Sequence, residues 1–290
     1  MGNPVRRKAV VTGASGGMGR ALARRFGATM DLVLTDVAAD KLRMLTEELR
    51  GEGYTVAASL PGDLAEDTLL AELVAGLGGE GGLGALLHAA GLSPQLADWD
   101  RIIRVNLVAT EKLLRAIEPA LAPGSVTVLI ASVAGHLMGP NIEIDTLLSD
   151  PVDPALIDRL RPKIAAPGTS DFGASAMAYG VSKRRVIDMA ERRAGRWAAK
   201  GARIVSISPG LIHTPMGLRE VQDPSAAGML AMTPAGRWGT VADIAEAAWF
   251  LCSEGASFIT GCDLRVDGGV IGAIRTSIDP AMRPMLAKAE

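Results

Sequence analysis

The chain has 290 residues, of which 48% are hydrophobic and only 3% aromatic, and its formal net charge is −2 at pH 7. This length leaves room for one large domain or two small ones, and the apolar content is ample for a core. The balanced charge, without a long block of one sign, argues against a nucleic-acid-binding protein, which usually carries a basic excess. No apolar run approaches the ~20 residues that span a bilayer. We therefore expect a soluble, cytoplasmic protein.

The cysteines and histidines do not indicate a metal site or a disulfide. The only two cysteines are Cys252 and Cys262, and the three histidines, His88, His136 and His213, lie far apart in the chain. Zinc sites and disulfide frameworks usually need more ligands at closer spacing. We expect both cysteines to be small core residues in a reducing cytosol, and we expect no bound metal.

Short apolar runs alternate with longer amphipathic ones along most of the chain. The runs typical of buried parallel strands are residues 8–11, 32–35, 56–59, 85–88, 126–131, 204–208 and 263–266. The helical patterns between them are residues 20–27, 39–51, 64–76, 99–121, 177–200 and 241–253. This alternation predicts an α/β fold, a doubly wound parallel sheet of seven strands with helices on both faces. No boundary or repeat divides the chain, so we expect a single domain over residues 1–290.

The first expected strand leads directly into a glycine-rich turn, Thr12-Gly-Ala-Ser-Gly-Gly-Met-Gly19, and a helix is expected to begin at Arg20. Glycines let a backbone approach a pyrophosphate closely, and a helix N-terminus offers free N–H groups and partial positive charge. This context predicts a dinucleotide site, although an ordinary glycine-rich turn shows the same pattern. A second glycine match, within residues 76–84, follows a helix and precedes a strand. That order is the reverse of what phosphate binding needs, so we interpret it as a loop.

Asp36 ends the second expected strand. An acidic residue at this place can hydrogen-bond the adenosine ribose hydroxyls and repel a 2′-phosphate. It could instead cap the helix that follows. Val37 and Ala38 come next, with no Arg or Lys nearby to attract a phosphate. We therefore predict NAD(H) rather than NADP(H) as the cofactor.

Residues 135–176 depart from the alternating pattern. They are rich in Pro, Asp and Gly, and they contain one expected short helix that begins at Asp153-Pro154 and runs toward Lys163. Proline directly after an Asp cap is a good helix start. A stretch of this length outside the regular pattern is usually functional or disordered.

Tyr179 and Lys183 lie four residues apart in an expected helix, well downstream of the glycine-rich turn. Positions i and i+4 share a helix face, so the Lys183 ammonium is expected within reach of the Tyr179 ring. A tyrosine ionises near pH ~10 and is a poor acid–base catalyst unless a fixed positive charge lies beside it. The pair can therefore move a proton while a dinucleotide moves a hydride.

With these features together, the chain closely resembles the short-chain dehydrogenase/reductase family, in its single-domain branch built on one Rossmann sheet. The resemblance rests on the glycine-rich turn, on Asn106 within Val-Asn-Leu, on Ser132 and on the Tyr179/Lys183 pair. It covers nearly the whole chain except residues 135–176 and the last ones. The sequence His88-Ala-Ala-Gly91 stands where the family usually has Asn-Asn-Ala-Gly or a variant of it.

The resemblance implies a catalytic tetrad. Tyr179 would take the proton of the substrate hydroxyl, and Lys183 would stabilise the tyrosinate and bind the nicotinamide ribose. Ser132 would donate a hydrogen bond to the substrate oxygen, where negative charge develops. Asn106 would interrupt its helix and hold a water that links Lys183 to solvent. The alternatives are an ordinary packing role for Tyr179 and a solvated or capping role for Asn106; we expect Ser182 to be structural.

The resemblance also implies cofactor contacts beyond the glycine-rich turn. Asp63-Leu64 resembles the pair that flanks the adenine ring, and Pro209-Gly210 with Ile212 and Thr214 resembles the loop that holds the nicotinamide carboxamide. The expected cofactor-binding residues are Gly13, Ser15, Gly16, Gly17, Met18, Gly19, Asp36, Asp63, Leu64, Ala89, Ala90, Gly91, Tyr179, Lys183, Pro209, Gly210, Ile212 and Thr214.

The substrate is expected to be decided by residues 135–176 and 216–233. Some bacterial hydroxysteroid dehydrogenase/carbonyl reductase relatives resemble this chain in having an insertion before the tyrosine. We interpret residues 135–176, hereafter the insert, either as a lid over a bulky apolar alcohol or ketone or as an element of subunit packing. Residues 216–233, rich in Met, are interpreted as a flexible second wall. The apolar residues expected in a lid are Leu137, Met138, Ile142, Ile144, Leu147 and Leu148.

The leading hypothesis is an NAD-dependent oxidoreductase that interconverts a secondary alcohol and a ketone, on an apolar substrate such as a steroid or other alicyclic alcohol. We expect a homodimer or homotetramer. One alternative is a lyase or epimerase on the same fold, although such relatives usually add a C-terminal substrate domain. The other is a non-catalytic dinucleotide-sensing protein.

Overall fold

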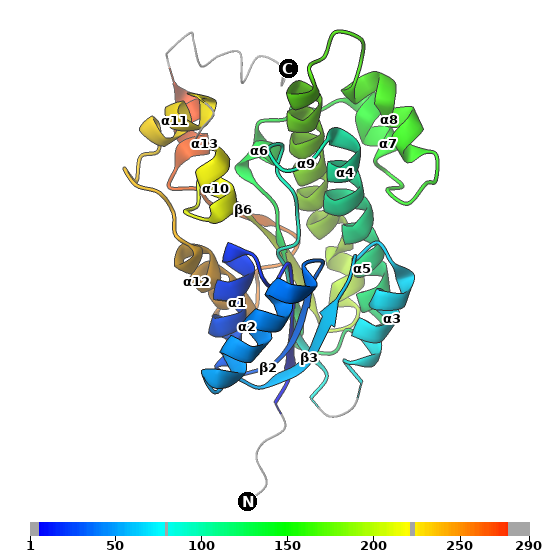
Figure 1. Ribbon diagram of the computed structural model, residues 1–290, viewed down its shortest axis with the longest axis vertical. Helices are drawn as coiled ribbons and strands as arrows, with labels where there is room; N and C mark the ends of the chain where they lie inside the picture. Colours follow the sequence, from blue (N-terminus) through cyan, green and yellow to red (C-terminus); the bar gives the residue numbers. More distant parts are fainter. Residues whose placement is uncertain (1–5, 79–80, 221–223, 278–290) are drawn as a thin grey trace, which may run out of the picture.

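The computed structural model describes residues 6–78, 81–220 and 224–277. Its centre is one parallel sheet of seven strands in the order β3-β2-β1-β4-β5-β6-β7. The strands are β1 (Lys8–Thr12), β2 (Asp31–Asp36), β3 (Val56–Pro61), β4 (Leu83–His88), β5 (Val126–Ile130), β6 (Arg203–Pro209) and β7 (Asp263–Val266). Helices cover both faces of the sheet (Figure 1), so the predicted doubly wound fold is confirmed.

Strand side chains alternate between two hydrophobic cores, one on each face of the sheet. In β1, Ala9 and Val11 belong to one core and Val10 to the other, and all three are fully buried. Because neither face meets water, such strands read as apolar runs without polar alternation. The helices over the first core are α1 (Gly17–Gly27), α2 (Ala39–Gly51) and α12 (Val241–Cys252). The helices over the second core are α3 (Asp67–Ala75), α4 (Trp99–Ile103), α5 (Ala109–Ile117) and α9 (Asp171–Ala198).

The helix expected over residues 99–121 is continuous but changes its hydrogen-bonding pattern. α4 passes into a π-helical turn, η1 (Arg104–Val108), and then into α5, which ends in a 3₁₀ turn, η2 (Glu118–Ala120). A π-helical turn inserted in an α-helix is rare and is frequently found at a functional site. In this chain it carries Asn106.

Two helices begin earlier than expected. α1 begins at Gly17, inside the glycine-rich turn, rather than at Arg20. α9 begins at Asp171, because the Ser170 hydroxyl accepts a hydrogen bond from the backbone N–H of Gly173 and caps the first turn. The last residues of the insert are therefore the first turns of the helix that carries Tyr179.

Several short helices were not expected from the sequence. They are α6 (Val133–His136), α7 (Ile142–Leu147), α10 (Pro215–Glu220), α11 (Pro224–Ala231) and α13 (Val270–Thr276). The short helix expected between Asp153 and Lys163 is present as α8 (Leu156–Ile164). Figure 1 shows α10, α11 and α13 grouped on one side beyond the sheet, and α7 and α8 on the other side, outside α9.

The insert extends the second hydrophobic core, which lies under α3, α4, α5 and α9. Ile144, Leu148 and Leu160 are buried in the same hydrophobic cluster as Trp99 of α4. The Arg161 guanidinium lies over the Trp99 ring, with its central carbon 5.3 Å from the ring centroid, a distance at which cation and ring attract each other. The insert therefore packs as a pair of helices against α4 and α9.

Candidate active site

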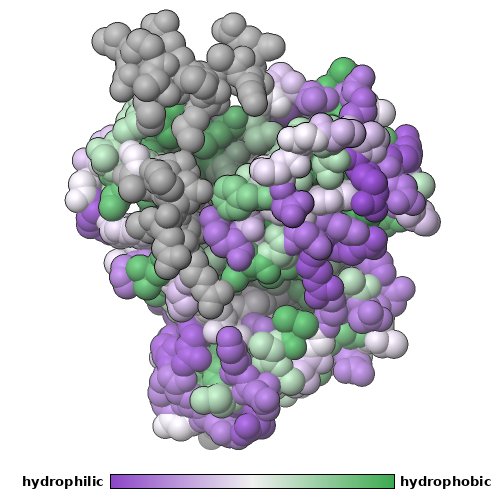
Figure 2. Space-filling model, turned by 45° about the horizontal axis from the view of Figure 1, so that its top comes forward, coloured by the Kyte–Doolittle hydropathy of each residue, from purple (hydrophilic) through white to green (hydrophobic). Residues whose placement is uncertain are grey.

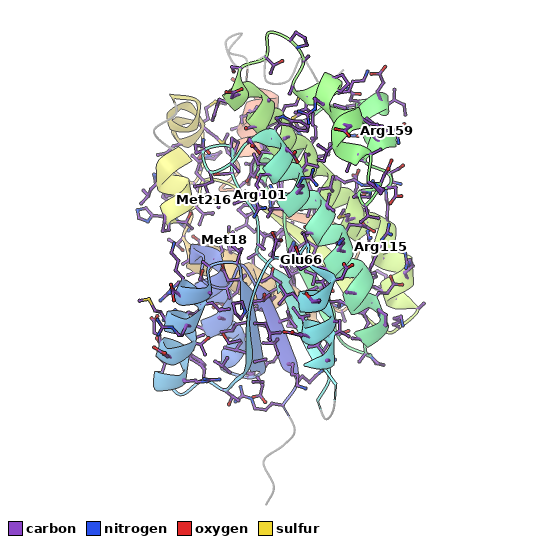
Figure 3. All side chains as sticks on the ribbon, turned by 45° about the vertical axis from the view of Figure 1, so that its right-hand side comes forward. Met18, Glu66, Arg101, Arg115, Arg159 and Met216 are labelled. Atoms are coloured by element: carbon purple, nitrogen blue, oxygen red, sulfur yellow. The ribbon has the colours of Figure 1, made fainter. Side chains whose placement is uncertain are left out.

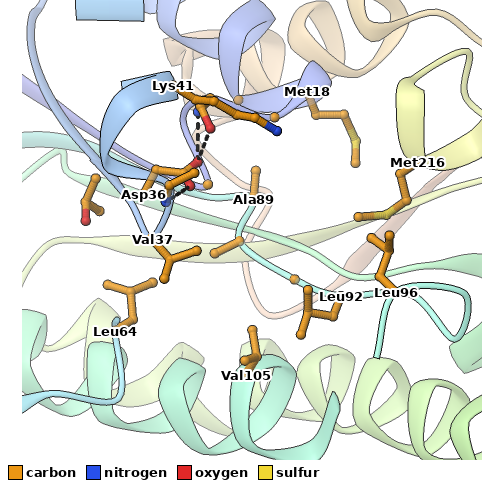
Figure 4. A pocket seen from close by; sticks show the side chains of 18 of the residues that line it. Met18, Asp36, Val37, Lys41, Leu64, Ala89, Leu92, Leu96, Val105 and Met216 are labelled. Carbon is orange, nitrogen blue, oxygen red and sulfur yellow. Dashed lines mark hydrogen bonds between the residues drawn. The ribbon is translucent and has the colours of Figure 1, made fainter. Parts of the chain in front are cut away.

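A cavity of about 440 Å³ opens at the carboxyl ends of β1, β2 and β4. Its walls are the glycine-rich turn, the end of β2, the loop after β4 and the beginning of α10 (Figure 4). The strand order reverses between β1 and β4, because the chain returns from β3 at one edge of the sheet to place β4 beside β1. In open parallel sheets, ligands bind at this kind of topological switch point.

Two glycines of the glycine-rich turn lie so close to other backbone atoms that a side chain would not fit at either position. Gly13 has φ +60°, and a Cβ there would lie 2.7 Å from the backbone nitrogen of Ala90. A Cβ on Gly19 would lie 2.1 Å from the Gly13 carbonyl oxygen. Gly16 precedes α1 without a side-chain cap, so the first N–H groups of this helix are left for a ligand. This glycine-rich turn, hereafter the glycine cradle, lies beside the uncapped N-terminus of α1. Together they fit the pyrophosphate of a dinucleotide.

Asp36 connects the end of β2 to the glycine-rich turn. Its Oδ2 accepts hydrogen bonds from the backbone N–H of Ser15 at 2.9 Å and from the Ser15 hydroxyl at 2.8 Å. Its Oδ1 accepts one from the backbone N–H of Ala38 at 3.0 Å. The carboxylate is therefore held at the cavity wall, where its oxygens keep lone pairs for a further hydrogen-bond donor.

The expectation that no Lys or Arg lies near Asp36 is wrong. Lys41, in the first turn of α2, lines the same cavity as Asp36 (Figure 4). Val37 and Ala38 directly after Asp36 carry no charge, but the first turn of α2 places Lys41 in the cavity lining. Arg101 of α4 also lines the cavity, and its Nη2 lies 3.4 Å from Oδ2 of Asp63.

Tyr179 and Lys183 share one face of α9, as predicted. Nζ of Lys183 lies 5.9 Å from the centroid of the Tyr179 ring and donates a hydrogen bond of 2.9 Å to the Ile130 carbonyl. Lys183 is only 6% exposed. A Cβ on Gly91 would lie 3.3 Å from the same Nζ, so the ammonium group lies against a residue of the cavity wall. The cation is thus buried, fixed and directed at the ring.

Ser132 follows β5 and forms the N-cap of α6. Its Oγ accepts a hydrogen bond from the Ala134 N–H at 3.2 Å, which leaves its own O–H to donate elsewhere. Glycines bring α6 very close to α9: a Cβ on Gly135 would lie 2.7 Å from the Arg184 nitrogen, and one on Gly180 would lie 2.6 Å from Sδ of Met138. This close packing holds Ser132 beside the turn of α9 that carries Tyr179 and Lys183.

Asn106 interrupts its helix, as predicted, because it lies in the π-helical turn η1. Its side chain is 1% exposed, so the alternative of a solvated or capping asparagine is wrong. The amide pairs with the backbone of Leu92, accepting from its N–H at 2.7 Å and donating to its carbonyl at 2.9 Å. Its Nδ2 also lies 3.4 Å from Oγ of Ser182, which donates to the Tyr179 carbonyl at 2.8 Å.

Most of the expected cofactor-binding residues line the cavity. They are Gly13, Ser15, Gly16, Gly17, Met18, Gly19, Asp36, Asp63, Leu64, Ala89, Ala90, Gly91 and Thr214. The expected residues outside its lining are Tyr179, Lys183, Pro209, Gly210 and Ile212, of which Gly210 and Ile212 line a second cavity of about 100 Å³. Of residues 76–84, which contain the second glycine match, those that the structure describes do not line the cavity; Gly79 and Glu80 lie outside the described residues.

Apart from Lys41 and Arg101, much of the remaining cavity wall is apolar. Leu92, Leu96, Val105 and Met216 line it, and Met18 and Met216 point toward one another across its mouth (Figure 4). Figure 2 shows hydrophobic surface in the hollows of this face, between rims that are largely hydrophilic. The sequence predicted only Met216 and Met18 of this set, because the others come from a loop and a helix whose orientation is a tertiary property.

Further apolar residues gather next to Ser132. Val133 packs in a small cluster with three side chains of α13, and Met229 and Met232 pack against it. Met229 and Met232 come from the segment expected to form a second wall, and they therefore lie against the cluster that contains Val133, the neighbour of Ser132. Residues 221–223 of that wall lie outside the described residues.

The insert does not contribute to either cavity. No residue of 135–176 lines them, and Figure 3 shows Arg159 of the insert well away from Met18 and Met216. Of the apolar residues expected in a lid, Ile144 and Leu148 are buried in the second hydrophobic core, whereas Ile142 is 80% exposed. Leu137, at the start of the insert, packs against the small cluster beside Ser132.

Metal ligands and reactive thiols do not gather within residues 6–78, 81–220 and 224–277. No three His, Cys, Asp or Glu side chains in this part of the chain lie together as they would around a metal ion. Burial raises the pKa of the Cys252 thiol to about 12, so this cysteine is unreactive. Within the same residues, no helix has the length and apolar character needed to cross a membrane.

Two family models match the chain in succession. One, described as short chain dehydrogenase, matches residues 7–144, and one, described as Enoyl-(Acyl carrier protein) reductase, matches residues 164–271. A short-chain dehydrogenase/reductase of Alternaria brassicicola is 30% identical over 274 residues, which cover 90% of this chain and 94% of that protein. An L-tagatose-forming galactitol 2-dehydrogenase of Cereibacter sphaeroides is 30% identical over 270 residues, with coverage of 90% and 93%.

A solved structure is similar over nearly the whole chain. It is a 7α-hydroxysteroid dehydrogenase in complex with NADH and 7-oxo glycochenodeoxycholic acid, with a TM-score of 0.70, 26% identity, and coverage of 91% of this chain and 93% of that one. The fold and the glycine cradle thus define a dinucleotide-binding oxidoreductase. The chain belongs to the short-chain dehydrogenase/reductase family, whose enzymes use nicotinamide dinucleotides and act on alcohols and ketones.

Proposed function

We propose that the protein is an NAD-dependent oxidoreductase that interconverts a secondary alcohol and its ketone, with Tyr179 as the general acid and base. The observation that carries this proposal is the buried ammonium group of Lys183, 5.9 Å from the centroid of the Tyr179 ring. Burying the charge of a lysine costs free energy unless that charge makes a favourable interaction. Here the ammonium group lies near the Tyr179 ring, and a tyrosine needs a positive charge beside it to transfer protons at neutral pH.

Tyr179 exchanges a proton with the substrate oxygen in both directions. In oxidation its phenolate oxygen takes the proton of the alcohol hydroxyl, and in reduction its hydroxyl gives the proton to the ketone oxygen. Lys183 stabilises the phenolate electrostatically in either case. The Ser132 hydroxyl, whose oxygen already accepts from Ala134, donates to the substrate oxygen and stabilises the negative charge that develops there. Asn106 supports this arrangement by holding Leu92 and, through Ser182, the first turn after Tyr179.

The glycine cradle and Asp36 would hold the two ends of the cofactor's adenosine diphosphate half. A bound nicotinamide dinucleotide supplies the carbon that takes or gives the hydride. The N-terminus of α1 would bind the pyrophosphate, Asp36 the adenosine ribose, and Lys183 with Thr214 the nicotinamide end. NAD is proposed over NADP because a carboxylate fixed at the end of β2 repels a 2′-phosphate. Lys41 beside it reduces this repulsion, so we expect a preference rather than an exclusion.

The cavity walls support an apolar substrate. Leu92, Leu96 and Met216 offer dispersion contacts, and methionine adapts to irregular apolar shapes. One similar protein acts on galactitol, a polyol, and another is a hydroxysteroid dehydrogenase. The apolar side chains named here suit a steroid or other alicyclic alcohol better than a polyol, whose hydroxyls would lose water without gaining hydrogen bonds.

We propose that the chain acts in the cytoplasm as a homodimer or homotetramer of one-domain subunits. β7 lies at an end of the sheet, so one side of it has no neighbouring strand in the described chain. Leu264 of β7 is 37% exposed, Phe250 of α12 is 48% exposed, and Phe258 is fully exposed. Exposed aromatic residues beside an open strand edge are typical of a subunit interface. The insert lines neither of the two cavities described above, which favours a role in subunit packing over a lid.

A substrate panel tests this proposal. The purified protein would be assayed with NAD or NADP and secondary alcohols that include steroids, alicyclic alcohols and polyols, with the nicotinamide absorbance as the signal. We expect NAD-linked turnover of the apolar alcohols and of the matching ketones with NADH. Turnover confined to polyols would contradict the substrate class. NADH binding without any turnover would contradict the enzymatic role and favour a dinucleotide-sensing protein.

A further inference from the structure

His88 begins the His-Ala-Ala-Gly motif at the end of β4, and the proposed reaction does not use its ionisable side chain. It ends β4, is 2% exposed, and bonds through both ring nitrogens. Nδ1 lies 2.7 Å from the Thr12 hydroxyl, and Nε2 lies 2.8 Å from the Thr110 hydroxyl. Thr12 ends β1 and Thr110 lies in α5, so the imidazole joins the sheet to the helix that carries the π-helical turn.

The directions of these hydrogen bonds are fixed by their ends. The Thr110 hydroxyl donates to the Asn106 carbonyl at 2.8 Å, because a carbonyl can only accept. Its oxygen must then accept from Nε2–H of His88. At the other end the Ala90 N–H donates to the Thr12 oxygen at 3.3 Å, and the Thr12 hydroxyl donates to Nδ1. Because burial and the charge of Lys183 keep the ring neutral, a hydrogen on Nε2 leaves Nδ1 as the acceptor of the Thr12 hydroxyl.

Electrostatics keep the ring in this neutral form. Burial, and then the positive charge of Lys183, lower the pKa of His88 to about 3. A second proton would occupy Nδ1 and leave the Thr12 hydroxyl without its acceptor. Each hydrogen bond in the series from Ala90 to Asn106 therefore keeps the same donor and acceptor at every physiological pH.

The two ends of this hydrogen-bonded chain belong to different parts of the site. Thr12 directly precedes Gly13 of the glycine cradle, where no Cβ fits. Asn106 holds Leu92 with its side chain, and a Cβ on Gly91 would lie 3.3 Å from both the Asn106 amide oxygen and the Lys183 ammonium. A shift of the Asn106 turn would therefore move the groups around Lys183 relative to the cradle.

We infer that His88 is a positioning residue, which fixes the π-helical turn of Asn106 against the glycine cradle through the two threonines. The inference rests on the proposed function for its kinetic consequences and on the hydrogen-bond geometry for its structural ones. Nδ1 serves the cradle through Thr12, and Nε2 serves the Asn106 turn through Thr110. Loss of the Nδ1 hydrogen bond should therefore change mainly the affinity for NADH, and loss of the Nε2 hydrogen bond mainly kcat.

Three variants separate these effects. His88→Leu removes both hydrogen bonds; His88→Asn keeps an acceptor near the place of Nδ1, and His88→Gln keeps a donor near the place of Nε2. Thr127→Val is the matched control, because it removes another buried hydrogen bond, the one of 3.0 Å from Trp197, away from the cavity. For His88→Leu we expect kcat to fall by about 100-fold, the effect typical of a displacement near 1 Å, and the Kd for NADH to rise. His88→Gln should recover more of kcat, and His88→Asn more of the NADH affinity.

Amide hydrogen exchange provides a readout that does not depend on turnover. In His88→Leu, exchange should accelerate over residues 104–110 and 89–92, whereas Thr127→Val should leave these segments at the wild-type rate. If the wild-type protein turns over no ketone, the proposed function fails, while the exchange comparison still decides the role of His88. Wild-type exchange over residues 104–110 in His88→Leu, or the same kcat and Kd in all three His88 variants, would overturn the inference.

Discussion

Lys183 connects the end of one strand to the ring of Tyr179. Its Nζ donates to the carbonyl of Ile130, the last residue of β5, at 2.9 Å and lies 5.9 Å from the centroid of the Tyr179 ring. Because the side chain is 6% exposed, bulk water and salt screen its charge only weakly. The charge therefore acts on its neighbours, and it contributes to the lowered pKa of His88.

The close packing of α6 on α9 predicts a strong effect of a single methyl group. Gly135→Ala places a Cβ 2.7 Å from the backbone nitrogen of Arg184, so we expect a loss of about 1–3 kcal/mol in the free energy of unfolding. We also expect a lower kcat, because α6 carries Ser132 at its N-cap. Urea unfolding and steady-state kinetics measure the two effects.

Gly195→Ala is the control for this substitution. Gly195 lies within α9, and a methyl group there would have nothing within 4 Å, so alanine should stabilise the protein by about 0.5–1 kcal/mol and leave kcat unchanged. Equal stabilities for the two variants would mean that α6 and α9 are not in close contact.

Charge at the end of β2 should set the cofactor preference. Asp36→Asn keeps an acceptor for Ser15 or Ala38 but removes the negative charge. A like charge at about 4 Å costs on the order of 1–4 kcal/mol, so we expect the NAD preference over NADP, measured as the ratio of kcat/KM values, to fall by about tenfold or more. Lys41→Ala in the same background should weaken NADP binding again.

Asp40→Ala is the matched control for Asp36→Asn, because its side chain is 95% exposed and does not line the cavity. It should leave the cofactor preference at the wild-type value. A preference that is unchanged in Asp36→Asn would show that this carboxylate does not face the adenosine ribose.

The buried imidazole predicts a specific dependence of stability on pH. Folding lowers the pKa of His88 from 6.5 to about 3, through burial and then the charge of Lys183. Between these values the unfolded chain binds a proton that the folded chain does not. The stabilisation is therefore complete above about pH 6.5 and is lost as the pH falls toward 3, by at most ~1.4 kcal/mol per pH unit.

His88→Gln isolates this contribution, since glutamine does not titrate. The free energy of unfolding by urea, measured for both proteins at several pH values from 7 to 4, should fall more steeply with acid in the wild type. Parallel curves would contradict the assignment of a neutral, buried His88.

The strands of the sheet could be predicted from the sequence because they depend on residue patterns within short segments. Each strand is buried on both faces and reads as an apolar run, and the glycine-rich turn marks where the first strand passes into a helix. Asn106 was expected to interrupt its helix only because of the family resemblance, and its hydrogen bonds to Leu92 depend on a loop that no helical periodicity reveals. Tertiary packing decides such contacts.

The insert shows the limit of apolar patterns most clearly. Ile144, Leu148 and Leu160 were visible as apolar residues, but their spacing does not say which surface covers them. In the structure they are buried in the same core cluster as Trp99 and do not line either cavity. Lys41 was missed for a related reason: its approach to Asp36 depends on the direction in which α2 leaves β2.

Substitution of Tyr179 tests the proposed mechanism most directly. The chain has only two tyrosines, so Tyr54→Phe is a control for the same chemical change outside the cavity. With a ketone that the wild type reduces, we predict that Tyr179→Phe binds NADH with nearly unchanged Kd, while kcat falls by about 10²–10⁴-fold because the proton donor is gone. Tyr54→Phe should keep the wild-type kcat. Near-normal turnover by Tyr179→Phe would contradict the assignment of this side chain as the acid–base group.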